Sequence, residues 1–187
     1  MKRNRRGRAL SYVLKIVLKY IDPLIWREVE VPKDTTLHQL HQVLQVVMGW
    51  TNSHLYLFDV AGRMYGEPSV EWEFEVRDST DTTLEEIVSD NSLSFYYEYD
   101  LGDSWMHEIT VQRVEESATE ERPRCTGGAR ACPPEDCGGP GGYANFLEAI
   151  ADPEHEEHLS MLEWAGGDFD PEEFDAGAID RLVIPWL

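Results

Sequence analysis

The feature that most constrains the fold is a run of alternating large side chains in the middle of the chain. A period of two is typical of a strand with one buried face, and two such runs joined by a Gly- and Asp-containing turn predict a β-hairpin. The chain is therefore expected to build an antiparallel sheet with an aromatic inner face. The alternating residues, on either side of the turn at 100–103, are Leu93, Phe95, Tyr97, Tyr99, Trp105, His107, Ile109 and Val111.

Upstream of the hairpin, the pattern predicts strand, strand, helix and strand. Residues 11–20 alternate, and a second strand is expected over residues 24–31 after an Asp-Pro turn. A threonine pair at 35–36 then caps a helix whose apolar residues recur at helical spacing, and Gly49 is a suitable end for it. Further elements are expected as strands over residues 55–60 and 71–76 and as a short helix near 83–88.

The second half of the chain combines an irregular segment with helices. Between residues 115 and 142 the periodicity is lost, and glycines, prolines and all three cysteines accumulate, which predicts a long ordered loop or a loop organised by a metal. Helices are expected over about 143–151 and 155–164, and a third helix starts within 168–174. Because strands come first and helices last, the sequence predicts a single α+β domain over residues 10–187. Its sheet is mainly antiparallel, with helices packed on one face and C-terminal helices.

The charge of the chain excludes several partners. The 187 residues include 16 Lys+Arg and 36 Asp+Glu, a formal net charge of −20. Five basic residues lie within residues 1–9, which we expect to form a disordered basic tail. Residues 148–180 alone hold twelve carboxylates and no Lys or Arg. Such a body repels phosphate backbones, so nucleic acid is expected to bind only through the tail, and a basic protein partner is favoured.

The sequence also indicates a compartment. No apolar run approaches the ~20 residues of a membrane-spanning helix, so no membrane association is expected. The N-terminus lacks the apolar stretch of a signal peptide, and three cysteines are a poor disulfide framework. We therefore expect a cytoplasmic protein.

The cysteine loop is a candidate zinc site. Cys125, Cys132 and Cys137 are separated by six and four residues, in a stretch whose glycines and prolines allow the sharp turns that present thiolates to one ion. A tetrahedral zinc ion needs a fourth donor, for which His107 is the first choice. The alternative is that the cysteines are small buried residues of a rigid loop that binds no cofactor. The reserve donors are Asp136, His54, His155 and His158.

Polar residues around the hairpin turn are candidates for a ligand cleft. Two carboxylates, Asp100 and Asp103, lie close in sequence to the imidazole of His107, and such a group can bind a divalent ion or carry out acid–base chemistry. A structural interpretation is also available, since aspartates bond the backbone of tight turns and His107 shares the buried face of the hairpin. The five residues expected to line this cleft are Trp50, His54, Asp100, Asp103 and Trp105.

Taken together, these segments resemble a known family. The motifs that carry the resemblance are collinear over residues 10–175 and comprise residues 25–32, 37–50, 54–58, 99–109 and 125–139. In this order they are similar to the plasmid pRiA4b ORF-3-like family. The resemblance implies an α+β domain with the same opening elements. Some members of that family are labelled as resolvase-like passenger proteins of mobile elements. This sequence has Tyr56 where a second histidine is usual after His54-Leu55.

Two classes of function remain. A serine resolvase needs a nucleophilic serine among clustered arginines, which this acidic body does not offer. No P-loop, dinucleotide-binding, nucleophile-elbow or HExxH motif is present. The sequence therefore favours a non-catalytic binding or adaptor module for a protein or small ligand, with a candidate structural zinc loop and no catalytic residue. The alternative is a metal-dependent hydrolase or nuclease-like accessory protein of a mobile element, using Asp100, Asp103, His107 and Asp136.

Overall fold

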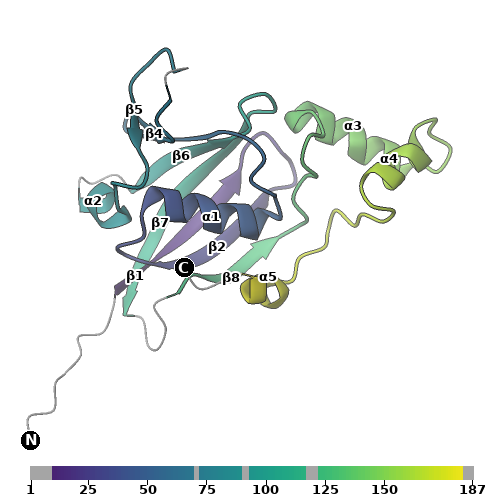
Figure 1. The fold of residues 1–187 in the computed structure, drawn as a ribbon. Helices are drawn as coiled ribbons and strands as arrows, with labels where there is room; N and C mark the ends of the chain where they lie inside the picture. Colours follow the sequence, from purple (N-terminus) through teal and green to yellow (C-terminus); the bar gives the residue numbers. More distant parts are fainter. Residues whose placement is uncertain (1–9, 70–71, 90–92, 117–121, 183–187) are drawn as a thin grey trace, which may run out of the picture.

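An eight-stranded sheet, with the strand order β5-β4-β3-β6-β7-β1-β2-β8, forms the body of the computed structural model (Figure 1). The structure describes residues 10–69, 72–89, 93–116 and 122–182, and the expected basic tail at 1–9 lies outside them. Neighbouring strands are antiparallel except β4 and β5, as an α+β domain with a mainly antiparallel sheet requires. The strands are β1 (Leu10–Leu18), β2 (Ile25–Pro32), β3 (Tyr56–Val60), β4 (Arg63–Gly66), β5 (Val76–Asp78), β6 (Ser94–Tyr99), β7 (Trp105–Glu116) and β8 (Arg124–Ala129).

Helix α1 packs against one face of this sheet, and buried residues of α2 and α3 join the same core. The longest described helices are α1, which lies across the sheet in Figure 1, and α3, which follows the cysteine loop. No helix among the described residues has both the length and the apolar character needed to cross a bilayer. The helices are α1 (Leu37–Met48), α2 (Leu84–Ser89), α3 (Gly139–Ala151), α4 (His158–Trp164) and α5 (Ala176–Leu182).

Local sequence signals set both ends of α1. The Thr36 hydroxyl accepts a hydrogen bond from the Gln39 amide, and the Gln39 side chain accepts one from the Thr36 amide, which completes a capping box. At the other end Gly49 has a φ of 78°, a left-handed conformation that glycine adopts without strain. The chain therefore leaves α1 at a fixed angle and enters the segment that begins with Trp50.

Some elements differ from the expected ones. A strand, β4, lies at Arg63–Gly66, where the sequence analysis expected no strand, and β5 begins at Val76 instead of residue 71. The segment expected to be a loop over 115–142 contains β8, which pairs with β2 although its own residues show no alternation. Helix α3 begins at Gly139, earlier than expected, because Pro140 suits the first turn of a helix.

The two faces of the sheet have different characters. On the inner face Phe95, Tyr97 and Tyr99 of β6 are buried and belong to the same core as α1. The alternate residue Tyr96 points to the outer face and is 44% exposed. The helices that pack on the inner face therefore leave the outer face of the central strands open to solvent.

Arg27 is a buried cation on the inner face of β2, with 3% of its surface exposed. Its Nε donates to the Val47 carbonyl at 2.9 Å, at the C-terminal end of α1. Its Nη atoms donate to the carbonyls of Trp26, Ala129 and Arg130 and to the Cys132 Sγ, at 2.8–2.9 Å. The guanidinium also lies 4.8 Å from the centre of the Phe174 ring. One side chain thus joins α1, β2 and the segment after β8.

We predict that Arg27→Met lowers the free energy of unfolding by at least about 3 kcal/mol, because it leaves several buried carbonyls without a hydrogen-bond donor. Urea denaturation followed by circular dichroism measures this change. Arg113→Met is the matched control, since Arg113 is 48% exposed and its solvent-screened ion pairs with Glu28 and Glu115 contribute little to stability. A loss at Arg27 no larger than that of the control would contradict the central role of this contact.

Candidate functional site

Three segments that are distant in sequence meet at one end of the sheet. They are the loop after α1, residues 51–55; the tip of the β6–β7 hairpin, residues 100–104; and the loop before α3, residues 133–138. Hydrogen bonds connect them pairwise: the Asp100 amide donates to the Leu55 carbonyl, and the Gly138 amide donates to Asp103 Oδ2. We refer to this region as the hairpin-tip site.

Trp50 forms the buried floor of the hairpin-tip site. It is 6% exposed, stacks on Tyr99 with ring centres 5.1 Å apart, and lies 6.0 Å from Trp105. Its Nε1 donates to the carbonyl of Pro133 at 3.0 Å. The indole therefore packs like a core residue while it fixes the start of the third segment.

Glu135 joins the first and third segments to the end of β6. Its Oε2 accepts hydrogen bonds from the amide and hydroxyl of Thr51, at 3.0 and 2.5 Å, and its Oε1 accepts one from the Tyr99 hydroxyl at 2.6 Å. The Tyr99 oxygen accepts in turn from the Ser53 amide. These bonds hold the residue that follows, Asp136, over the hairpin tip.

The two carboxylate oxygens of Asp100 have different roles. Oδ1 accepts from the amides of Gly102 and Asp103, at 3.0 and 3.3 Å, and this arrangement stabilises the turn. Oδ2 points toward His54. The turn packs tightly against α3, because a Cβ at Gly139 would collide with the carbonyl oxygen of Asp103.

His54, Asp100 and Asp136 bring three potential metal ligands together. Their ligand atoms all lie within 4.8 Å of one another, and no other group of three His, Cys, Asp or Glu does so in the described part of the chain. His54 Nε2 is 2.9 Å from Asp136 Oδ1 and 3.6 Å from Asp100 Oδ2. Neither contact has hydrogen-bond geometry, so Nε2 has no hydrogen-bond partner among the described residues. Asp100 is nearly buried, whereas the side chain of Asp136 is 68% exposed.

A buried polar network supports the site from α1. His41 is fully buried, with Nδ1 2.8 Å from the Tyr97 hydroxyl and Nε2 2.8 Å from Asn52 Oδ1. Its ring stacks on Tyr56 with centroids 3.6 Å apart. The pKa of His41 is lowered to about 4, because burial penalises the imidazolium. Gln45 completes the network by donating to Tyr97 and accepting from the Asn52 amide.

A small hollow of about 220 Å³ adjoins this network. Of the five residues expected to line a cleft, only His54 lines this hollow. Trp50 and Trp105 lie beneath the site, and Asp100 and Asp103 stabilise the hairpin tip. The other lining residues are Asn52, Ser53, Leu55, Tyr56 and Glu67.

The structure does not gather the expected zinc set of three cysteines and His107. The thiol of Cys125 sits at the edge strand β8, Cys132 contacts Arg27 and Met48, and Cys137 precedes α3. Burial raises the pKa of the Cys132 thiol to about 11 and that of Cys137 to about 12. The fourth residue, His107, is fully buried beneath Trp50, and burial lowers its pKa to about 4. Among the described residues, no three of Cys125, Cys132, Cys137 and His107 bring their ligand atoms to within 4.8 Å of one another.

Sequence reasoning found part of the hairpin-tip site. It singled out His54 and Asp100 and kept Asp136 as a reserve ligand, but it did not combine the three. It missed Glu135 altogether, although Glu135 positions Asp136. The available signal was the adjacency of Glu135 and Asp136 within a proline-rich turn, which alone does not reveal that Thr51 and Tyr99 are the partners.

Comparisons with known proteins identify the family of this chain and two similar proteins. The family model of the plasmid pRiA4b ORF-3-like proteins matches residues 10–178. The uncharacterized protein y4hQ of Sinorhizobium fredii is 41% identical over 179 residues, 92% of each chain. The crystal structure of a protein of unknown function, MM3350 of Methanosarcina mazei, has a TM-score of 0.81 and 33% identity, and the match covers 90% of this chain and 96% of that one. The fold is therefore similar to one determined experimentally.

We predict that stability falls as the pH drops from about 6.5 toward 4, because His41 and His107 take up protons more readily in the unfolded chain than when folded. Each histidine is expected to lower the free energy of unfolding by about 2 kcal/mol between pH 7 and pH 5. Urea denaturation at a series of pH values measures this loss.

The His41→Gln variant should lose about 2 kcal/mol of that pH dependence. His155→Gln, which changes a histidine outside the sheet core, should keep it. An unchanged slope in His41→Gln would show that His41 does not stay neutral in the folded protein.

Proposed function

Because the chain belongs to the plasmid pRiA4b ORF-3-like protein family, whose matched relatives carry no assigned activity, we propose its function from the geometry of the hairpin-tip site. The protein is a cytoplasmic ligand-binding module whose cleft is organised by a divalent cation held by His54, Asp100 and Asp136. The observation that carries this proposal is the convergence of their ligand atoms within 4.8 Å. The free thiols of all three cysteines agree with a reducing compartment.

The electrostatics of the three side chains favour a bound cation. Two carboxylates point at the same imidazole nitrogen, and none of the contacts is a hydrogen bond. The carboxylates of Asp100 and Asp136 converge on this nitrogen, and a cation bound among the three ligand atoms offsets the repulsion between the two anionic groups. One imidazole and two carboxylates suit Zn²⁺ or Mn²⁺ better than Mg²⁺ or Ca²⁺, which prefer sites made of oxygen alone.

The surroundings of the three ligands suit a binding site. Asp100 is fixed by the hairpin turn, and Asp136 is fixed through its neighbour Glu135. Three protein ligands leave further coordination positions, which the exposure of Asp136 opens toward solvent and toward a ligand. The hollow beside His54 is large enough for a small polar group of that ligand.

A second candidate function, a metal-dependent hydrolase, rests on the same open positions. A cation with a coordinated water can activate that water as a nucleophile. The set of residues first considered for this chemistry is divided in the structure, since Asp100 and Asp136 meet His54 while His107 is buried. Release of nitrophenol from an activated phosphodiester, dependent on Zn²⁺ or Mn²⁺ and abolished by His54→Ala, would favour hydrolysis over binding alone.

We predict that the protein binds one equivalent of Zn²⁺ or Mn²⁺ at the hairpin tip. Calorimetric titration with ZnCl₂ and MnCl₂ should show one saturable site. At a free metal concentration of about 100 times the Kd, the cation should raise the free energy of unfolding by about 2.7 kcal/mol. His54→Ala and Asp136→Asn should each weaken binding at least tenfold, an order-of-magnitude expectation for the loss of a ligand.

Matched controls distinguish this site from adventitious binding on an acidic surface. His155→Ala and Asp168→Asn remove the same groups elsewhere and should leave the Kd unchanged. A titration without a saturable equivalent, or one that His54→Ala leaves unaltered, would rule out the proposed centre. Protein with Cys125→Ser and Cys132→Ser should retain the metal, because neither thiol contributes to this group.

A further inference from the structure

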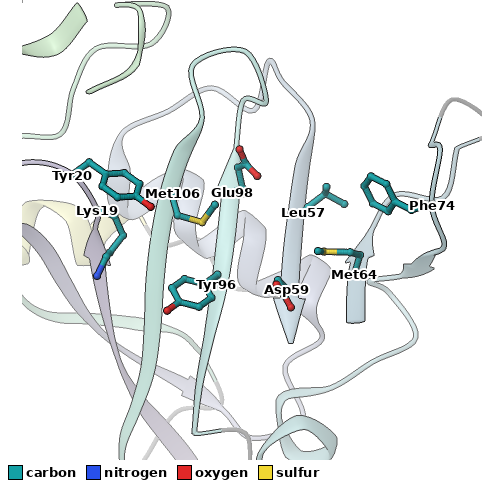
Figure 2. A pocket seen from close by; sticks show the side chains of 9 residues that line it. All are labelled: Lys19, Tyr20, Leu57, Asp59, Met64, Phe74, Tyr96, Glu98 and Met106. Carbon is teal, nitrogen blue, oxygen red and sulfur yellow. The ribbon is translucent and has the colours of Figure 1, made fainter. Parts of the chain in front are cut away.

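A groove runs across the open outer face of the sheet, on the opposite side from α1 (Figure 2). It encloses about 430 Å³, twice the size of the hollow at the hairpin tip. Side chains from β3, β4, β6 and β7 line it, with Lys19, Tyr20 and Phe74 at its ends. We call it the open-face groove.

Apolar side chains dominate the walls of the open-face groove. Tyr96 and Met106 lie on neighbouring strands, and Leu57 and Met64 continue the surface. Phe74 and Tyr20, at the ends, are 49% and 78% exposed. Large exposed aromatic and methionine side chains of this kind are typical of surfaces that adapt to a protein partner.

The groove carries a net negative charge, because its one lysine is already paired with a glutamate. The ammonium of Lys19 lies 2.7 Å from Glu108 Oε2 and is neutralised by it. Asp59 accepts from the Gly62 amide and Glu98 from the Ser104 hydroxyl, and neither forms an ion pair with another described residue. Two uncompensated carboxylates therefore flank an apolar wall on a chain of net charge −20.

The two carboxylates belong to no group of three potential metal ligands among the described residues. Asp59 is opposite Tyr96 and Leu57 is opposite Glu98, so the two acids are diagonal neighbours on β3 and β6. Diagonal neighbours on a sheet face are about 7 Å apart, a spacing that allows each carboxylate to pair with a separate cationic side chain of one bound segment.

We propose that the open-face groove binds an amphipathic, basic peptide segment of a partner protein. Apolar side chains of the segment enter the groove between Tyr96 and Met106, and its Lys or Arg side chains pair with Asp59 and Glu98. The aromatic rings of Tyr20, Phe74 and Tyr96 can also contact those cations through their faces. The proposal is independent of the metal centre, which lies at the hairpin tip and shares no residue with the groove.

The test uses three synthetic peptides of about 14 residues, four helical turns. The first places Leu on one face and Lys on the other, the second replaces Lys by Glu, and the third replaces Leu by Ser. Only the first is expected to bind with a measurable Kd in fluorescence anisotropy. Its Kd should rise with ionic strength, because the charged contacts are partly exposed.

Two pairs of variants locate the binding to the groove. Tyr96→Thr with Met106→Thr should weaken binding at least about tenfold, since both central apolar contacts are lost. Asp59→Asn with Glu98→Gln should weaken it about fivefold at low ionic strength and little at high ionic strength, while the turn and hairpin bonds are retained. The matched controls are Val114→Thr, an exposed apolar residue elsewhere on β7, and Glu30→Gln on β2, and both should bind as the wild type does.

Three results would overturn this proposal. The first is failure of the Leu/Lys peptide to bind. The second is binding that both groove double variants leave unchanged, because the peptide would then bind the acidic C-terminal region instead. The third is self-association, measured by sedimentation, that disappears in Tyr96→Thr with Met106→Thr, because a second copy of the chain would then occupy the groove. His54→Ala should leave peptide binding unchanged, so failure of the metal centre remains distinguishable.

Discussion

The buried guanidinium of Arg27 is the contact on which the position of the hairpin-tip site depends. Burying a cation is costly unless its donors are satisfied, and here all five N–H bonds are used without a carboxylate. The acceptor on α1 is the carbonyl of Val47, at the end where the helix dipole is negative. Because backbone carbonyls are fixed by the elements that carry them, Arg27 sets the distance between α1, β2 and the chain after β8.

That distance determines where the third segment of the site lies. The chain continues from Cys132, which Arg27 holds, to Pro133, which Trp50 holds, and to Glu135, which Thr51 and Tyr99 hold. Asp136 is therefore placed by contacts of its predecessors, although its own side chain is largely exposed. Bringing Asp136 beside Asp100 costs electrostatic repulsion, and these successive bonds are what maintain the arrangement without a cation.

Much of the framework could be predicted because it depends on local sequence signals. The capping box and Gly49 define α1, and strict alternation defines β1, β2 and the β6–β7 hairpin. The strand β8 could not be predicted in the same way, since its Gly- and Thr-containing sequence forms a strand only where β2 offers an edge. Parallel pairing of β4 with β5 is equally a consequence of the tertiary fold.

The same distinction between local signals and tertiary contacts applies to the hairpin-tip site. His54 and Asp100 lie beside strong local signals, the end of α1 and the hairpin turn, so sequence reasoning singled them out. The cysteines are clustered in sequence, but the sequence does not show that their thiols fail to converge on one point among the described residues. The alternation of β2 places Arg27 between Ile25 and Val29 on the buried face, but the sequence does not show which groups accept its hydrogen bonds.

Both proposed sites bind a cation through carboxylates, but the spacing of their ligand groups suits a different cation at each site. At the hairpin tip, ligand atoms converge to within 4.8 Å, and only a small, dense cation fits between them. On the open face, the carboxylates lie on different strands beside aromatic and methionine side chains, so a larger amphipathic basic peptide fits better. A net charge of −20 favours both ligands at long range and opposes phosphate-rich ones. A cation at the tip would offset that repulsion only within about a Debye length, roughly 8–10 Å, so a nucleic-acid substrate would still meet an acidic surface beyond it.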